Sequence, residues 1–334
     1  MIITTTKELP LSENRVAITP QSAKKYISQG YKVIIESNAG INSGFDDSLY
    51  ISVGAEVKND ISDILRQSDV LLKINPPSIN ELKHIKKSSF ILANFNGYIS
   101  KELLNQIHKK TLNCFALEKT PRISKAQSFD ILSSQDNLSG YQSVIKATEM
   151  LKNIIPMMIT SAGTLAPVKF LILGIGVAGL QAIATAKRLG AKVYAHDIRS
   201  ETKEQAQSLG AIFIEDINEI ISNIDVIIAS AFSIDKKAPL LIKKSTLKTM
   251  KKGSILIDMA ISNGGNIEGS QAGKITDIFN CKIYADSHLA NQIPQSASIL
   301  YANNLSNFID YLALKPDQTP LINKKDDIIK ATFI

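Results

Sequence analysis

The sequence predicts an α/β protein made of two doubly wound, parallel-sheet domains separated by a cleft. Three observations lead to this prediction. Short apolar runs alternate with amphipathic stretches up to Leu117, the same alternation begins again at Val168, and a G-x-G-x-x-G turn follows the first strand of the second series. The length of 334 residues is too great for one ordinary core and suits two.

The first series begins with a clear helix signal. Thr19 is a typical N-cap residue, Pro20 suits the first helical position, and Gly30 ends the helix. The rest of the series alternates in the same way: strands are expected over 31–37, 69–74, 88–95 and 111–117, and helices over 60–68 and 100–110. This βα alternation favours a mostly parallel sheet.

A polar stretch, residues 121–137, interrupts the pattern. It shows no strand alternation and is rich in Ser, Gln and Asp, so we expect a loop without buried elements. The helix that follows is expected to bury one face, formed by Leu138, Tyr141, Val144, Ile145 and Leu151. The domain boundary is placed in this loop and helix, which gives an N-terminal domain of residues 1–135 and a second domain of residues 136–297.

The last helix is amphipathic, and we expect it to return to the first domain. Its apolar residues recur at helical spacing: Tyr301, Leu305, Phe308, Ile309 and Leu312. The segment of about 298–334 is therefore predicted to complete the N-terminal domain.

The most informative stretch is the glycine-rich turn with its flanking elements. An apolar strand (168–173) precedes Gly174, Gly176 and Gly179, a helix follows, and a second strand (191–196) ends next to Asp197. This is the arrangement of a Rossmann-like dinucleotide site, in which the glycines allow a tight turn, close approach of a pyrophosphate and close helix packing. Asp197 can accept hydrogen bonds from a ribose diol and would repel a 2′-phosphate, so NAD(H) is favoured over NADP(H), although Arg199 could favour the phosphate.

Further candidates lie where strands of the second series end, because such ends line the ligand crevice of a doubly wound sheet. Asp258 and the segment 263–265 could either contact the nucleotide or turn the chain. The predicted cofactor-binding residues are Gly174, Gly176, Val177, Ala178, Gly179, Asp197, Ile198, Arg199, Ser230, Ala231 and Phe232.

Composition excludes several other classes of protein. The net charge is +7, but the lysines are scattered, which is typical of a solvated surface and not of a nucleic-acid site. Two cysteines cannot form a disulfide framework and no Cys/His cluster has metal-ligand spacing, so no metal site is expected. No secretory signal is recognisable at the N-terminus, and neither uncharged stretch beside Lys169 reaches the ~20 residues of a membrane span.

At this point the residues resemble a known family. The loop PRISKAQSFDILSSQDNLSGY is similar to the signature loop of the alpha subunit, the NAD(H)-binding component, of proton-translocating NAD(P) transhydrogenase. LGIGVAGLQAIATAKRLGA, KELPLSENRVAITP and DDIIKATFI resemble the same component, so the resemblance covers essentially the whole chain. Alanine dehydrogenase is the related family with the same two-domain fold.

The resemblance implies a role, partners and a location. The chain would bind NADH and pass hydride to NADP+ held by a partner subunit, while a membrane-spanning subunit couples this step to proton movement. It implies a homodimer on the cytoplasmic face of the inner membrane, held there by the partner subunits. It assigns Arg122, Gln127, Asp130 and Ser133 to the surroundings of the nicotinamide ring, with an Arg–Asp pair fixing the loop. Hydride transfer between two nicotinamides releases no proton, so positioning of the rings is the main requirement.

Two alternatives remain at this stage. An alanine dehydrogenase would use Arg15 and Lys73 for its substrate, and both residues are present, but no His occurs in residues 93–97, where its acid–base group is expected. A catalytically reduced NAD(H)-binding paralogue is suggested by departures from the transhydrogenase pattern. The segment between Gly210 and Asp225 is too short for the family's mobile lid, the loop 230–239 lacks an expected Pro-Gly, and Gln292 stands where an Arg is expected.

Overall fold

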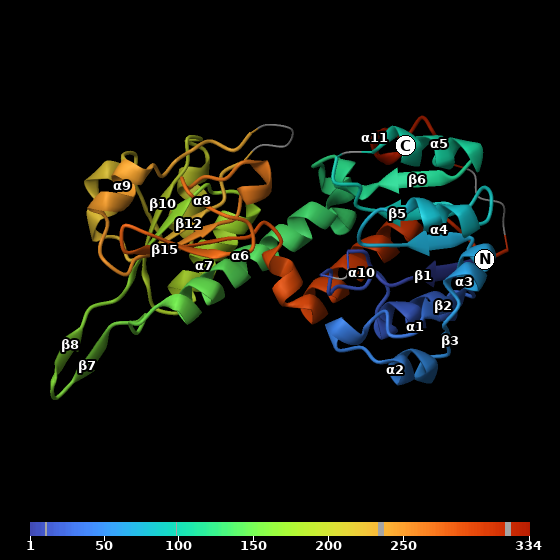
Figure 1. The fold of residues 1–334 in the computed structure, drawn as a ribbon, viewed down its shortest axis with the longest axis horizontal. Helices are drawn as coiled ribbons and strands as arrows, with labels where there is room; N and C mark the ends of the chain where they lie inside the picture. The colour runs from blue at the N-terminus through green and yellow to red at the C-terminus, as the bar shows by residue number, and fades with distance from the viewer. Residues whose placement is uncertain (11, 98, 233–236, 318–321) are drawn as a thin grey trace. The chain divides into compact units, whose positions relative to one another are not determined.

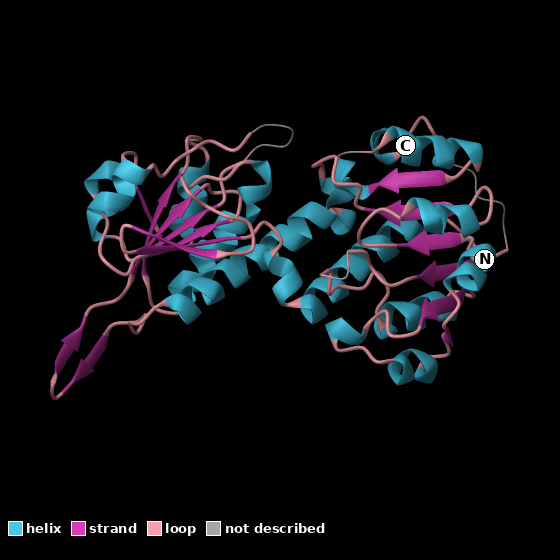
Figure 2. Ribbon diagram, in the orientation of Figure 1, coloured by secondary structure: helices cyan, strands magenta, loops and turns pink. Residues whose placement is uncertain are grey.

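The computed structural model describes residues 1–10, 12–97, 99–232, 237–317 and 322–334. The chain forms two compact units. Unit 1 comprises Met1–Gln135 and Ile293–Ile334, and unit 2 comprises Asp136–Gln292. Each unit is an open sheet with helices on both faces (Figures 1 and 2), so the predicted α/β class is confirmed.

The sheet of unit 1 is entirely parallel. Its strands are β1 (Ile2–Thr5), β2 (Lys32–Glu36), β3 (Glu56–Lys58), β4 (Val70–Leu72), β5 (Phe90–Ala93) and β6 (Asn113–Ala116). Their spatial order is β3-β2-β1-β4-β5-β6, which is the doubly wound order, so a topological switch point lies between β1 and β4.

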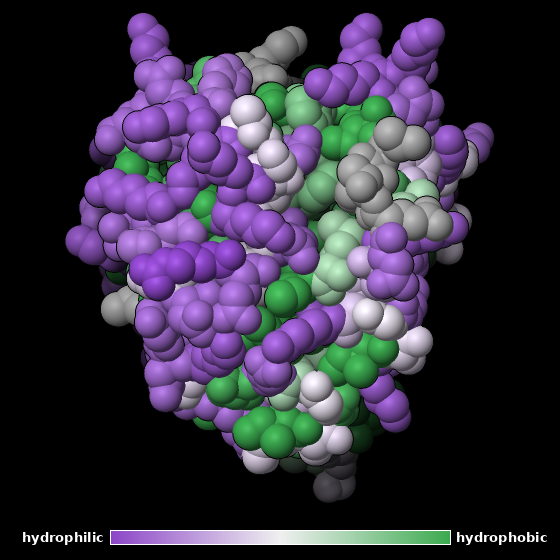
Figure 3. All heavy atoms as spheres, turned by 90° about the vertical axis from the view of Figure 1, so that its right-hand side faces the viewer, coloured by the Kyte–Doolittle hydropathy of each residue, from purple (hydrophilic) through white to green (hydrophobic). Residues whose placement is uncertain are grey.

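Helices cover both faces of this sheet. They are α1 (Pro20–Ser28), α2 (Asp47–Ser52), α3 (Ile61–Gln67), α4 (Ile79–His84), α5 (Lys101–Lys109), α10 (Pro294–Tyr311) and α11 (Asp327–Thr332), with short 3-10 turns η1 (Ile41–Ser43), η2 (Leu117–Lys119) and η3 (Ser124–Phe129). Thr19 caps α1 in a capping box with Ser22, as the sequence indicates. Successive strand residues alternate between two apolar clusters: Leu72 and Phe115 face α10, whereas Leu71 and Cys114 face the other side. Figure 3 shows one face of unit 1, where hydrophilic residues predominate and apolar residues form smaller patches.

Helix α10 returns to unit 1 and supplies a large part of its core. Its residues Tyr301, Leu305, Phe308 and Ile309 are all at most 1% exposed. Phe308 packs edge-to-face on Phe115 and Phe129 at ring distances of 5.4 and 5.3 Å. The amphipathic face predicted for this helix is therefore its buried face, and the C-terminal segment forms one compact unit with the first 135 residues.

The sheet of unit 2 has the same order, extended by one edge strand. Its strands are β9 (Lys169–Leu173), β10 (Lys192–His196), β11 (Ile212–Phe213), β12 (Val226–Ala229), β13 (Ile255–Asp258), β14 (Ile275–Ile278) and β15 (Cys281–Ala285), in the order β11-β10-β9-β12-β13-β15-β14. All neighbours are parallel except β14 and β15, which pair antiparallel at the edge. The helices that lie wholly within unit 2 are α7 (Val177–Arg188), α8 (Thr202–Ser208) and α9 (Lys244–Thr249), with 3-10 turns η4 (Ile217–Glu219), η5 (Ile221–Asn223), η6 (Ile261–Asn263) and η7 (Leu289–Gln292).

The polar stretch, residues 121–137, was predicted to be a loop without buried elements, and this prediction is wrong. Helix α6 (Ile131–Met150) begins inside it, and Ala126, Phe129 and Ile131 are buried. The buried face predicted for the helix is also wrong in part, because Tyr141 is 41% exposed. Beyond Ile131, the residues that do become buried in the helix are small, apart from Val144: Ser139, Gly140, Ser143 and Ala147. A Cβ at Gly140 would overlap the carbonyl oxygen of Ala178, so the close approach of α6 to α7 requires a small face that hydrophobicity alone does not reveal.

A two-stranded hairpin, β7 (Met158–Thr160) and β8 (Gly163–Leu165), was not expected from the sequence. It forms a separate sheet that extends from the rest of unit 2 (Figure 1). No charged residue occurs between Ile154 and Val168, and Met157, Ile159 and Leu165 are 59%, 73% and 53% exposed. Such a pair of strands is at best marginally stable by itself in water.

We expect Phe308→Ala to destabilise the protein by about 3–5 kcal/mol, because it removes a fully buried ring that joins α10 to the sheet of unit 1. The measurement is equilibrium unfolding in urea followed by circular dichroism. Asn303→Ala on the exposed side of the same helix is the control and should change stability by less than about 0.5 kcal/mol. A Phe308→Ala protein as stable as the control would contradict the placement of α10.

Candidate functional site

The glycine-rich turn joins β9 to α7 and has the geometry expected of it. Gly174 has φ +91°, and a Cβ there would lie 2.9 Å from the backbone nitrogen of Ala231. A Cβ at Gly179 would overlap the carbonyl oxygen of Gly174. These two positions therefore accept only glycine without movement of the backbone.

Gly176 differs from its two neighbours. Nothing lies within 4 Å of a Cβ built there, so open space surrounds this side of the backbone. Gly176 is also the N-cap of α7 and provides no side-chain cap, which leaves the first N–H groups of a 12-residue helix facing outward. Val177 is half-buried and Ala178 is buried in the first turn. This combination of space and N–H donors is what a pyrophosphate group requires.

Asp197 lies at the end of β10 and is tied to this turn. One of its carboxylate oxygens accepts the N–H of Ile175 at 2.6 Å, and the other accepts the N–H of Arg199 at 2.9 Å. The Arg199 guanidinium donates to both oxygens, at 3.0 and 2.9 Å. Burial opposes ionisation of Asp197, but the hydrogen bonds from Arg199 and Ile175 outweigh it and lower the pKa of the carboxyl. Ile198, between the two, is 93% exposed.

The loop after β12 is held by a residue that the sequence analysis missed. The hydroxyl of Ser230 donates a hydrogen bond to the carbonyl of Gly174 at 3.1 Å, which links this loop to the glycine-rich turn. Asn266 is fully buried and both accepts from the backbone of Ala231 at 3.0 Å and donates to it at 2.8 Å. Phe232 is 43% exposed, and residues 233–236 of this loop lie outside the described part of the chain. The sequence feature that could have indicated Asn266 is its position directly after two glycines that follow a predicted strand.

Asp258 turns the chain, which resolves the choice left open by the sequence. It is fully buried, and its carboxylate accepts the N–H groups of Ala260, Asn266 and Ile267 and the hydroxyl of Ser270. Since a buried carboxylate with four donors has no free surface for a nucleotide, its effect is to fix the loop that places Asn266.

The polar loop of unit 1 is anchored but keeps exposed side chains. Asp130 accepts from the N–H and hydroxyl of Ser133 at 2.9 and 2.7 Å at the start of α6. The Arg–Asp pair implied by the resemblance is not formed: Arg122 is exposed and makes no ion pair with Asp130 in the described structure. Gln127 is also exposed, so the loop presents a guanidinium and an amide to solvent from a fixed backbone.

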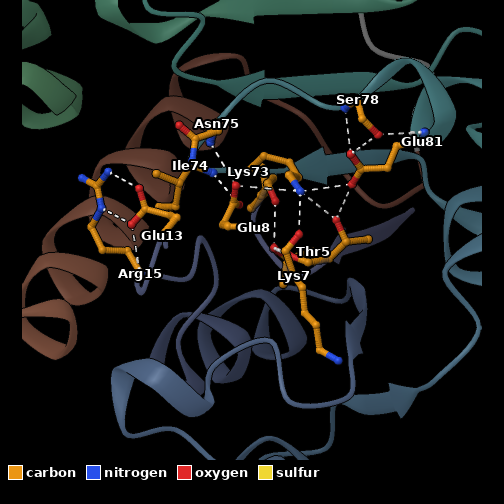
Figure 4. Close-up of polar contacts among 12 residues, drawn as sticks. Thr5, Lys7, Glu8, Glu13, Arg15, Lys73, Ile74, Asn75, Ser78 and Glu81 are labelled. Atoms are coloured by element: carbon orange, nitrogen blue, oxygen red, sulfur yellow. Dashed lines mark hydrogen bonds and ion pairs between the residues drawn. The ribbon is translucent and has the colours of Figure 1, made fainter. Parts of the chain in front are cut away.

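A buried ionic cluster occupies the centre of unit 1, at the ends of β1 and β4 (Figure 4). Lys73 is 1% exposed, and its ammonium lies 2.9 Å from the carbonyl of Lys7, 3.0 Å from Thr6 Oγ1 and 3.1 Å from Glu81 Oε1. Glu8 lies 3.8 Å away and accepts from two backbone N–H groups. Burial raises the pKa of Glu8 to about 6, against the opposing effect of Lys73. Burial acts in the same direction on Glu81, but Lys73 and the donors from Ser78 and Thr6 leave its pKa lowered.

Arg15 is satisfied in a similar way. Its guanidinium donates to both oxygens of Glu13, at 2.8 and 2.7 Å, and to Gln135 Oε1 at 2.8 Å. Burial opposes its charge, but the contacts with Glu13 leave its pKa raised. Both cations that an alanine dehydrogenase would need for its substrate are thus engaged by carboxylates of unit 1.

Neither a metal site nor a membrane span is found in the described ranges. No group of three or more His, Cys, Asp or Glu side chains there could hold a metal ion. Likewise, no helix among the residues that the structure covers is both long and apolar enough to cross a bilayer.

Comparison with known proteins identifies the class that this fold and turn define. Residues 4–139 match the family described as "Alanine dehydrogenase/PNT, N-terminal domain", and residues 143–334 match "Alanine dehydrogenase/PNT, C-terminal domain". The chain therefore belongs to the alanine dehydrogenase/PNT family, whose members bind NAD(H), and the resemblance seen in the sequence is confirmed.

Within that family, the chain is similar to transhydrogenase subunits. It is 38% identical to the first section of the split "NAD(P) transhydrogenase subunit alpha" of Rickettsia prowazekii, covering all of this chain and 94% of the relative. It is 35% identical to the protein of the same name from Rhodospirillum rubrum, covering 100% and 96%. The crystal structure of a transhydrogenase from Sinorhizobium meliloti superposes with a TM-score of 0.92 at 40% identity, covering 100% of this chain and 96% of that one. An L-alanine dehydrogenase structure has a TM-score of 0.86 at 23% identity and shows the shared fold.

The alignment is longer than this chain. The Rickettsia alignment has 365 positions against 334 residues here, so at least 31 positions have no residue in this chain. In the structure, residues 214–225 connect β11 to β12, and the only regular elements among them are the short turns η4 and η5.

We expect Lys73→Met to destabilise the protein by about 3–5 kcal/mol at pH 8, because it leaves two buried carboxylates without their cation. The loss should be smaller at pH 5. The folded-state pKa of Glu8, about 6, lies above its ordinary value of 4.5, so ionising Glu8 disfavours folding increasingly as the pH rises through this interval, and protonation at lower pH relieves the unpaired charge.

Urea unfolding at both pH values measures this effect. Lys32→Met, which removes an exposed lysine paired with Glu56, is the matched control and should cost at most about 1 kcal/mol at either pH. If Lys73→Met lowered the free energy of unfolding equally at pH 5 and pH 8, the assignment of the pH-dependent destabilisation to Glu8 would be contradicted.

Proposed function

We propose that this chain is the NAD(H)-binding subunit of a proton-translocating NAD(P) transhydrogenase, which transfers hydride from NADH to NADP+ on a partner subunit. The observation that supports it most is the open, uncapped N-terminus of α7 at Gly176 with Asp197 beside it, in a chain similar over its full length to transhydrogenase alpha subunits. The proposal rests on the fit of these groups to a dinucleotide without a 2′-phosphate.

In this proposal, three sets of residues bind different parts of the coenzyme. The pyrophosphate takes the N–H groups at the start of α7, over Gly176, Val177 and Ala178. The hydroxyls of the adenosine ribose donate hydrogen bonds to the carboxylate of Asp197, beside Ile198. Ser230, Ala231 and Phe232 line the nucleotide at the neighbouring strand end, where Asn266 fixes the backbone.

The nicotinamide end is assigned to the polar loop, as the resemblance implies. Arg122 and Gln127 are exposed and have side-chain donors for the carboxamide, while Asp130 and Ser133 hold each other and fix the start of α6. Hydride passes directly from one ring to another, so no side chain must remove or supply a proton. The loop therefore needs only to keep the ring oriented, with its reacting carbon about 3–3.5 Å from the acceptor, and open to a second nucleotide.

The proposal includes partner subunits. NADP(H) belongs on a separate subunit, and membrane-spanning subunits couple hydride transfer to proton translocation and hold this chain at the cytoplasmic face of the inner membrane. The names of the similar relatives, which denote sections of a multi-subunit transhydrogenase, support this arrangement.

Two alternatives have less support. Alanine dehydrogenase activity would need Arg15 and Lys73 free for a substrate carboxylate, whereas both are engaged by internal carboxylates. A catalytically reduced paralogue is favoured by the short β11–β12 connection, and by the missing Pro-Gly in residues 230–239 and Gln292 in place of an Arg. It would bind NADH and transfer no hydride.

The central test is a reconstituted assay. The full chain alone should bind NADH, seen as a change in NADH fluorescence, and should reduce an NADP+ analogue only when an NADP(H)-binding transhydrogenase subunit is added. Gln127→Asn should lower the transfer rate about 10- to 100-fold, since shortening the amide by one carbon misplaces the ring, and should change NADH affinity by less than about threefold.

Gln21→Asn, the same change at an exposed position on α1, is the control and should leave the rate unchanged. Absence of any NADH fluorescence change would count decisively against the proposal. Deamination of alanine by the chain alone would favour the dehydrogenase, and NADH binding without transfer would favour the reduced paralogue.

We also propose a homodimer, and the apolar hairpin supports it, because burial of its exposed Met158, Ile159 and Leu165 against another chain would be favourable. Ile159→Lys should weaken self-association at least about tenfold, measured by size-exclusion chromatography with light scattering. Leu240→Lys, another exposed apolar residue of unit 2, is the control. A monomeric wild type, or an Ile159→Lys protein as dimeric as the wild type, would argue against this role.

A further inference from the structure

The Asp197–Arg199 pair beside the glycine-rich turn is more than a single carboxylate for a ribose. Arg199 Nε and Nη2 donate to the two carboxylate oxygens at 3.0 and 2.9 Å, a two-pronged contact. Nη2 also lies 3.2 Å from the carbonyl oxygen of Ile175, within the turn itself. The guanidinium therefore sits at the place where the adenosine ribose of a bound dinucleotide is expected, and its charge is taken up by Asp197.

The two residues differ in how firmly they are fixed. The Asp197 side chain is 6% exposed and is held by two backbone N–H groups as well as by Arg199. The Arg199 side chain is 51% exposed, and its guanidinium has only Asp197 and one carbonyl as partners among the described contacts. Removal of the carboxylate would thus release an exposed guanidinium at the edge of the turn without moving the backbone that carries it.

The other side chains with basic nitrogens near this strand end are less suitable. Lys203, on α8, is paired with Glu215 at 3.5 Å and lies over the ring of Phe213. His196 directs Nδ1 to the carbonyl of Ile214 at 3.1 Å. Arg199 is therefore the side chain best placed to meet a phosphate on the ribose, and a guanidinium binds phosphate through the same two-pronged geometry that it now uses for Asp197.

We propose that Arg199 is a concealed binding group for a 2′-phosphate and that Asp197 excludes NADP(H) in two ways, by its own negative charge and by holding Arg199. The selection of NAD(H) then depends on one residue: without the Asp197 carboxylate, the same site accepts NADP(H) with no new cation introduced. This inference rests on the proposed function, because it assumes that the dinucleotide binds at this turn.

The test compares NADH and NADPH binding to the full chain by coenzyme fluorescence. Asp197→Asn is the main variant, because the amide oxygen can still accept the N–H of Ile175 while the charge that holds Arg199 is lost. NADPH should bind this variant at least about tenfold more tightly than it binds the wild type, the effect of one charge-assisted contact, and NADH should bind several-fold more weakly.

Two double variants identify the group responsible. Asp197→Asn with Arg199→Gln should lose the gain in NADPH affinity. Asp197→Asn with Arg188→Gln, which removes the same charge from an exposed position at the far end of α7, should keep it. Asp197→Ser replaces Asp197→Asn if thermal melting shows that the latter does not fold.

The outcomes separate this inference from the proposed function. A wild type that binds neither coenzyme overturns both. A wild type that binds NADH, together with an Asp197 variant that gains no NADPH affinity or an Arg199→Gln double variant that keeps the gain, overturns only the role of Arg199.

Discussion

The close approach of α7 to the backbone around it is the constraint on which the nucleotide-binding half depends. Gly179 faces the carbonyl of Gly174, and Gly140 of α6 faces the carbonyl of Ala178, with no room for a Cβ at either position. These contacts fix the first turn of α7 from two sides, so its N–H groups point toward the open space at Gly176. A methyl group at either glycine would move the helix start, and with it the donors that a pyrophosphate needs.

The sequence predicted those features of this arrangement that depend on periodicity. Alternating apolar runs and capping residues such as Thr19 gave the order of the elements, and the spacing of Gly174, Gly176 and Gly179 gave the turn. The same reasoning failed for α6. Beyond its first residue, α6 buries mostly small residues, two of them serines, and its Gly140 packs against the backbone of α7. A hydrophobicity pattern does not reveal such a contact. Asn266 was missed for a related reason: its role is to bond with Ala231, which is distant in sequence.

The polar loop shows a different limit of sequence reasoning. Similarity to a family supplied Arg122, Gln127, Asp130 and Ser133, and an Arg–Asp pair with them, but the structure pairs Asp130 with Ser133 instead. A residue's identity at a motif position thus did not determine its partner. Phe129, which precedes Asp130, explains part of this difference in pairing. It packs on Phe308 and Tyr311 of α10, so apolar contacts anchor the loop while Arg122 stays exposed to solvent.

The ionic cluster of unit 1 shows how one fold can serve two chemistries. A dehydrogenase acting on an amino acid must keep cations for a carboxylate and an acid–base group for the amine. Here Arg15 forms an ion pair with Glu13, and Lys73 forms ion pairs with Glu81 and Glu8. The segment 93–97 contains no histidine. Breaking such pairs to admit a substrate would leave buried carboxylates without a counter-charge, at a cost of about 3–5 kcal/mol. Hydride exchange between two nicotinamides needs none of these groups to be free, so their engagement within unit 1 is compatible with that reaction and opposes deamination.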